Sequence, residues 1–179
     1  MRTTRTLATG FATLALLAAA TLGVAAQSSP PPPAQTVPAE FSGRIVFGPQ
    51  VRNETTTTVD GRTETRGGAW TPTITSMSDP RLDGTATISF DTDAYVGPDG
   101  TSMGVGTGTW RIENADGAWQ GSYNIVMTDA YGSTATMPLV GEGAYDGLTA
   151  IWESTIGDSG WDVRGVILPA APPAPPTAP

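Results

Sequence analysis

The strongest constraint on the fold is an alternation of glycine and large apolar residues within residues 104–148. In the segment GVGTGTWRIENADGAWQGSYNIVMTD, Gly108, Trp110 and Ile112 alternate with polar side chains. Alternate residues of a β-strand point to opposite faces of the sheet, so this period of two predicts strands. Residues 114–117, Asn-Ala-Asp-Gly, have the composition of a turn. The stretch therefore predicts a β-hairpin followed by a second, similar segment of glycine and aromatic residues at residues 135–148.

The same period of two recurs across residues 40–168, and no segment of ten residues has a helical pattern. Short strands separated by turn residues are typical of an antiparallel sandwich or barrel. Glycine inside the strands favours the barrel, because it permits strong coiling. We therefore expect an all-β domain, an antiparallel barrel of eight to nine strands.

Three local expectations follow from turn residues and composition. Asp60 and Gly61 favour a tight hairpin turn between the threonine-rich residues 51–59 and residues 62–69. That hairpin is polar on both faces, which is typical of a sheet edge or a long loop. Residues 70–77 are expected to form a further strand, and residues 91–102 a loop.

The composition excludes several classes of chemistry. The chain has no Cys and no His, and its nine basic residues are all Arg against 17 acidic residues, a net charge of −8. It therefore has no Ser-His-Asp triad, thiol nucleophile, Schiff-base lysine, or imidazole or thiolate metal site. The acidic balance argues against nucleic acid as a partner, since phosphates need a basic face. We expect no cofactor.

Both ends of the chain differ in composition from its middle. Residues 1–26 combine Arg2 and Arg5 with an apolar run that ends in Val-Ala-Ala, which predicts a cleaved secretory signal peptide. A transmembrane anchor is the alternative, because the run approaches the length needed to span a bilayer. Residues 27–39 form a Pro-rich linker and residues 169–179 a Pro/Ala-rich tail, both expected to be disordered. The predicted location is secreted or the cell envelope, with no membrane span after cleavage.

Aromatic residues and one arginine are the candidates for binding a ligand. Trp110 and Trp119 flank the turn at residues 114–117 and have a geometry in which they can stack across the hairpin. They either fill the core or face a ligand. The candidate ligand-binding set comprises Trp110, Trp119, Tyr123, Trp152 and Arg81. Arg81 either binds a ligand carboxylate or pairs with the neighbouring Asp79 to hold a turn.

Carboxylates are the remaining candidates for catalysis and metal binding. Glu142 and Tyr145 lie close together in a turn-rich segment, where burial would raise a carboxyl pKa towards neutrality and permit acid–base chemistry. Solvated loop charges are the alternative. Asp91, Asp93 and Asp99 alternate with other residues as calcium ligands do, but no closing Glu follows. We therefore expect no metal site.

Three segments resemble a known family. SDPRLDGTATISF, GTGTWRIENADGAWQGS and LVGEGAYDGLTAIWES look like signatures of a family of secreted, largely uncharacterised bacterial proteins. That family is similar to the eight-stranded barrels of allene oxide cyclase and dirigent proteins. The resemblance covers roughly residues 78–168 and implies a barrel of the calycin or allene-oxide-cyclase-like kind. No catalytic residue of either barrel matches a residue of this chain, so the resemblance implies no activity.

Three functions remain open from the sequence. The first is a non-enzymatic secreted barrel that binds a small apolar ligand or an envelope partner. The second is a cyclase or isomerase that shapes its substrate in the barrel cavity, with Glu142 or Tyr145 as the polar group. The third is a structural or surface-interaction protein in which the threonine-rich hairpin at residues 51–69 docks onto a partner. The sequence sets neither the ligand nor the oligomeric state.

Overall fold

The structure is a computed structural model that describes residues 38–46, 50–52, 54–129, 132–157 and 160–170. The predicted signal peptide at residues 1–26 lies outside the described residues, as does most of the Pro-rich linker and of the Pro/Ala-rich tail. Among the described residues, no helix is long and apolar enough to cross a membrane.

The described part of the chain is all-β, with one short 3₁₀ helix before the long central strands. Most strands have inward residues that are buried and outward residues that are exposed, as the period of two in the sequence predicts. The elements are β1 Ala39–Ile45, β2 Gln50–Arg52, β3 Thr55–Val59, β4 Arg62–Trp70, β5 Thr73–Ile74, η1 Pro80–Leu82, β6 Gly84–Val96, β7 Ser102–Glu113, β8 Gly117–Thr128, β9 Gly132–Gly143, β10 Thr149–Gly157 and β11 Gly160–Leu168.

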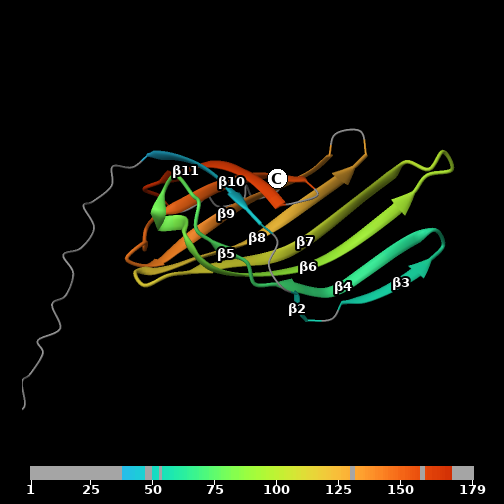
Figure 1. The fold of residues 1–179 in the computed structure, drawn as a ribbon, viewed down its shortest axis with the longest axis horizontal. Helices are drawn as coiled ribbons and strands as arrows, with labels where there is room; N and C mark the ends of the chain where they lie inside the picture. The colour runs from blue at the N-terminus through green and yellow to red at the C-terminus, as the bar shows by residue number, and fades with distance from the viewer. Residues whose placement is uncertain (1–37, 47–49, 53, 130–131, 158–159, 171–179) are drawn as a thin grey trace, which may run out of the picture. The chain divides into compact units, whose positions relative to one another are not determined.

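The strands form one antiparallel sheet in which β6 to β11 are a simple up-and-down meander (Figure 1). The sheet order is β1-β11-β10-β9-β8-β7-β6-β4-β2, with β3 paired to β4 and β5 paired to β6. Strand β1 returns to pair with the last strand, β11, so the beginning and the end of the described domain lie side by side. Short turns suffice for the connections of the meander, because each of its strands pairs with its neighbour in sequence.

The hairpin of β3 and β4 forms as its turn residues predict. Asp60 and Gly61 have φ angles of 50° and 75°, the left-handed values that a two-residue turn between paired strands requires. Strand β3 lies at an edge of the sheet with all five residues exposed. Of the two alternatives for this segment, an edge strand or a long loop, the structure has the edge strand.

The expected closed barrel of eight or nine strands is not what the strand ladders form. Among the described residues there are eleven strands, and the path of paired strands ends at β1 and β2 without closing. Strand β1 instead contacts the segment between β5 and η1 through two hydrogen bonds. Ser78 N–H donates to Ser42 O at 2.8 Å, and Ser42 N–H donates to Ser78 Oγ at 2.9 Å. The sheet is therefore curled, and single hydrogen bonds rather than a ladder join β1 to this segment.

Two strand boundaries differ from expectation for a physical reason. Within residues 70–77, Trp70 ends β4 and the only further strand is the two-residue β5. Pro72, which has no N–H to donate to a ladder, stands directly before β5. Strand β6 runs on to Val96, so it takes in the first half of the predicted loop at residues 91–102. Its acidic residues do not end it, because Asp91 and Asp93 have bonding partners on the adjacent strand β4.

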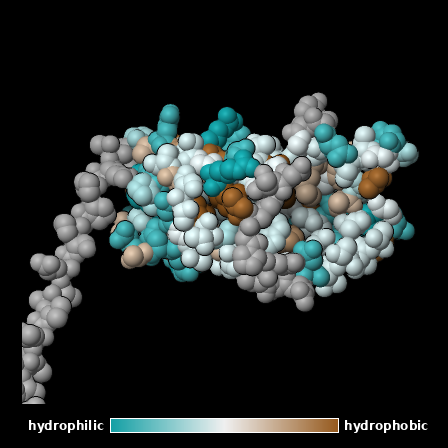
Figure 2. Space-filling model, viewed as in Figure 1, coloured by the Kyte–Doolittle hydropathy of each residue, from teal (hydrophilic) through white to brown (hydrophobic). Residues whose placement is uncertain are grey.

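The concave face of the curled sheet carries the core. Trp110, Trp152 and Trp161 lie at its centre, with ring centroids 4.9 Å apart for Trp110–Trp161 and 5.4 Å apart for Trp110–Trp152. The outer surface seen in Figure 2 is mostly hydrophilic or neutral, and hydrophobic residues appear there only in small separate groups. Burial of the large aromatic side chains is thus the main stabilising contribution that the fold offers.

Candidate functional site

A row of glycines on β7 leaves part of the concave face without side chains. Gly104, Gly106 and Gly108 occupy three successive inward positions, and their partners across the β7–β8 ladder are Met127, Ile125 and Tyr123 respectively. The side chains from β8 lie over the bare backbone of β7. A Cβ placed on the glycines would be 2.7 Å from Met127 Cε, 2.7 Å from Ile125 Cγ2 and 2.6 Å from Tyr123 Cε1.

An apolar pocket of about 240 Å³ lies above these three β8 side chains. Two of its walls are aromatic, because the Trp70 ring centroid is 4.6 Å from that of Phe90 and 6.4 Å from that of Trp161. None of the described residues that line the pocket is charged. They are Trp70, Phe90, Thr92, Tyr123, Ile125, Met127, Ser133, Ile156 and Trp161.

The volume limits what the pocket accepts. A cavity of about 150 Å³ is enough for benzene, and pockets for larger ligands usually begin at about 300 Å³. At about 240 Å³ the pocket has room for one compact apolar group, such as a fused pair of rings. Most of its lining side chains are half-buried rather than fully buried, as at the mouth of a cavity that opens to solvent.

A bulge in β4 sets the wall formed by Phe90. The ladder between β4 and β6 shifts register between Thr65 and Gly68, and Gly67 has a φ of 72°. The Phe90 ring then lies directly against Gly68, where any side chain would overlap it. Because Gly68 carries no Cβ, the Phe90 ring can lie against the backbone of β4 and form a wall of the pocket.

Tyr123 contributes its ring to the pocket and keeps its hydroxyl engaged. The Tyr123 O–H donates to Ser89 O at 3.1 Å. Burial raises the pKa of Tyr123 to about 12, since desolvation disfavours the phenolate. The group is therefore neutral at physiological pH, and Thr92 and Ser133 add hydroxyls to the pocket wall.

Of the predicted ligand-binding residues, only Tyr123 lines this pocket. Trp110 and Trp152 are about 1% and 0% exposed and pack beneath it in the core, where Trp152 also contacts Phe41 at 5.6 Å between ring centroids. Trp119 lies in a different cluster. Its ring stacks on Tyr145 at 5.0 Å, and its Nε1–H donates to Arg81 O at 2.8 Å.

Arg81 has its guanidinium already bound within the protein. Its Nε and Nη2 donate to the two carboxylate oxygens of Asp79 at 2.9 and 2.6 Å, and both side chains are largely buried. This bidentate pair fixes the turn at η1. Of the two alternatives for Arg81, the structure therefore contains the turn-stabilising pair with Asp79.

Glu142 and Tyr145 are close together in the backbone but use separate partners. Glu142 Oε2 pairs with Arg111 Nη1 at 2.9 Å on the outer face. The Tyr145 O–H donates to Asn114 Oδ1 at 2.9 Å within the core, and burial raises the pKa of Tyr145. The two side chains do not form the acid–base pair that their spacing suggested, and a catalytic role for either stays a hypothesis.

The acidic residues of the β6 region also bond separately. Asp91 accepts from Gly67 N–H at 2.7 Å, Asp93 from Arg66 Nη2 at 2.6 Å, and Asp99 from Thr101 Oγ1 at 2.7 Å. Throughout the described ranges, no group of three or more carboxylate side chains is placed to hold a metal ion. The three aspartates thus organise the backbone of the β4–β6–β7 region.

The sequence hypotheses missed the aromatic walls of the pocket. Trp70, Phe90 and Trp161 were not among the predicted site residues, although Phe90 pairs with Gly68 and Trp161 directly follows Gly160. The Gly67-Gly68 and Gly160-Trp161 pairs were the available signal, because glycine within a strand often marks a bulge or a close approach.

Comparisons with known proteins identify no family. No protein-family model matches the chain, and neither the curated proteins nor the solved structures contain a significant match to it. The architecture itself is an all-β antiparallel sheet with a buried aromatic cluster.

Proposed function

We propose that this protein binds a small, uncharged, apolar ligand in the pocket above Tyr123, Ile125 and Met127. The observation that carries the proposal is the apolar pocket of about 240 Å³ between the β8 side chains that cover the three glycines of β7 and the aromatic side chains Trp70, Phe90 and Trp161. Contact of apolar and aromatic side chains with water is unfavourable, so an apolar ligand that fills this pocket would be stabilised by the surface it buries.

The chemistry of the lining favours binding over catalysis. The described lining residues include no carboxylate, and the one titratable group, the Tyr123 phenol, is neutral and already bonded to Ser89 O. A cyclase or isomerase that acts by shaping its substrate needs no more than the cavity, so it remains the alternative proposal. It would rely on the aromatic walls rather than on Glu142 or Tyr145.

Export to the cell surface or medium is part of the proposal. It rests on the signal-like residues 1–26 and on the resemblance of residues 78–168 to secreted barrels related to allene oxide cyclase. Mass spectrometry of the protein from its own host is expected to find a mature chain that starts at Gln27. A membrane-bound chain that retains residues 1–26 would support the anchor instead.

Calorimetric titration with naphthalene tests the binding function, since two fused rings match the volume of the pocket. The wild-type protein is expected to bind, and Thr92→Ile to weaken binding by about tenfold or more, because extra carbon atoms in a filled pocket cost about 1–3 kcal/mol. Thr87→Ile is the matched control, since Thr87 lies exposed on the outer face of the same strand. If wild type binds no naphthalene, or if both variants bind alike, the pocket is not a ligand site.

A further inference from the structure

The inner face of the β3–β4 hairpin continues the wall of the pocket with threonines. Thr92 lines the pocket, and its partner across the β4–β6 ladder is Thr65. Thr65 in turn pairs with Thr56, and Thr63 pairs with Thr58, across the β3–β4 ladder. Because residues directly opposite each other in a ladder share a face, these five threonines form one surface that adjoins the pocket. We call it the threonine surface.

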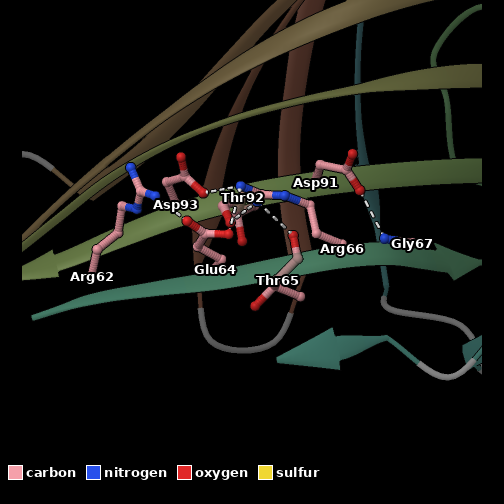
Figure 3. Close-up of polar contacts among 8 residues, drawn as sticks. All are labelled: Arg62, Glu64, Thr65, Arg66, Gly67, Asp91, Thr92 and Asp93. Atoms are coloured by element: carbon pink, nitrogen blue, oxygen red, sulfur yellow. Dashed lines mark hydrogen bonds and ion pairs between the residues drawn. The ribbon is translucent and has the colours of Figure 1, made fainter. Parts of the chain in front are cut away.

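Charged side chains of the same strands lie on the opposite face. Arg62, Glu64 and Arg66 alternate with the threonines of β4, and Arg66 Nη2 pairs with Asp93 Oδ1 at 2.6 Å and with Glu64 Oε2 at 3.5 Å. Figure 3 shows this network on one side of the strands, with the Thr65 side chain on the other. Arg62 also bonds to Glu64. The charges thus pair with one another away from the threonine surface.

The threonine surface has the chemistry that suits a neutral, hydroxyl-rich ligand group. Each hydroxyl can both donate and accept a hydrogen bond, and each methyl group offers apolar contact. Thr56 and Thr58 are exposed, whereas Thr63, Thr65 and Thr92 are half-buried, so solvent exposure of the threonine side chains increases away from the pocket. The five threonines offer a charged group no ionic partner, because the charged side chains of β4 lie on the opposite face.

We propose that the ligand is an uncharged amphiphile, with its apolar part in the pocket and a hydroxyl-bearing head group, such as a sugar or polyol, on the threonine surface. The inference rests on the proposed function, because the apolar part of the same ligand occupies the pocket that the threonine surface adjoins at Thr92. Thr92, shared by the pocket and the threonine surface, joins the two parts of the site.

Three probes that share a naphthalene ring system distinguish binding in the pocket from binding of a head group on the threonine surface. Naphthalene tests the pocket alone, β-naphthyl glucoside adds a neutral hydroxylated head, and naphthalene-β-sulfonate adds an anionic one. Calorimetry is expected to show the glucoside binding about tenfold more tightly than naphthalene, which is what one or two net hydrogen bonds supply. The sulfonate is expected to bind no more tightly than naphthalene.

Paired variants locate the head group. Thr63→Val with Thr65→Val removes two hydroxyls but keeps the β-branched shape that a strand favours. It is expected to reduce glucoside affinity to that of naphthalene and to leave naphthalene binding unchanged. Thr55→Val with Thr57→Val is the matched control, because these threonines lie on the opposite face of β3, across from Arg66 and Glu64.

The outcomes distinguish this inference from the proposed function. If naphthalene does not bind, the pocket fails as a ligand site and the inference falls with it. If naphthalene binds but the glucoside gains nothing, or the sulfonate binds more tightly than the glucoside, the inference alone is overturned. It is also overturned if the inner and outer threonine pairs change glucoside affinity equally.

Discussion

The ring of Phe90 occupies the space that a side chain at position 68 would need. Phe90 and Gly68 are partners across the β4–β6 ladder, and a Cβ on Gly68 would overlap three carbons of the ring. The aromatic wall of the pocket and the bulge in β4 are therefore one feature. A single missing methyl group permits both, so this position is the first to test.

Gly68→Ala is expected to destabilise the protein by about 1–3 kcal/mol, because the added methyl group displaces the Phe90 ring or the strand. Urea unfolding followed by tryptophan fluorescence measures the change. Gly157→Ala is the control, since the nearest atom to a Cβ there is Gly160 O at 3.8 Å. It is expected to change stability by no more than about 0.5 kcal/mol. Equal losses in the two variants would contradict the close packing of Phe90 on Gly68.

Arg81→Ala is expected to cost about 3–5 kcal/mol, because it leaves the carboxylate of Asp79 buried without its partner. The two side chains are 13% and 6% exposed. Asp162→Asn tests an exposed pair of the same type, since Arg44 and Asp162 are 47% and 69% exposed. Such a pair contributes about 0–1 kcal/mol. Chemical denaturation would refute the distinction if both variants lost similar stability.

Asn114→Ala is expected to destabilise the β7–β8 turn by about 3 kcal/mol or more, since it removes several hydrogen bonds at once. Asn114 Oδ1 accepts from the backbone N–H groups of Asp116 and Gly117 and from the Tyr145 O–H, while its Nδ2 donates to two carbonyls. Asn124→Ala, at an exposed position of β8, is the control and is expected to have little effect. Thermal unfolding of both variants measures the difference.

Tyr123 makes stability depend on pH in the alkaline range. Its pKa is raised from 10.0 to about 12 in the folded protein, so the phenol holds its proton more tightly when folded than when unfolded. The contribution is fully present below pH 10 and is lost as pH rises towards 12, by roughly 2 kcal/mol. Tyr123→Phe is expected to lack this component of the pH dependence. Urea titrations across the range, with Tyr145→Phe for comparison, measure it. An unchanged alkaline slope in Tyr123→Phe would show that Tyr123 is not its source.

The sequence was sufficient for the strands because the period of two is local. The alternation around Trp110, the turn at residues 114–117 and the left-handed pair Asp60 and Gly61 each depend on neighbouring residues only. The all-β class and the antiparallel pairing of neighbouring strands follow from them. Closure into a barrel does not depend on neighbouring residues alone, because it requires the two edge strands of the sheet to meet. Pro72 also interrupts the segment that was expected to form another strand.

The candidate site could not be predicted from the sequence either, because it too depends on contacts between residues far apart in the chain. Glycine in a strand is compatible with a bend, a close contact or a cavity, and the sequence alone does not distinguish these. Only the register between β7 and β8 places Gly104, Gly106 and Gly108 opposite Met127, Ile125 and Tyr123. Only the curl of the sheet then brings Trp161, near the end of the chain, to Trp70 and Phe90. Alternation along a strand determines which face each side chain takes, whereas contacts across the sheet determine what that face encloses.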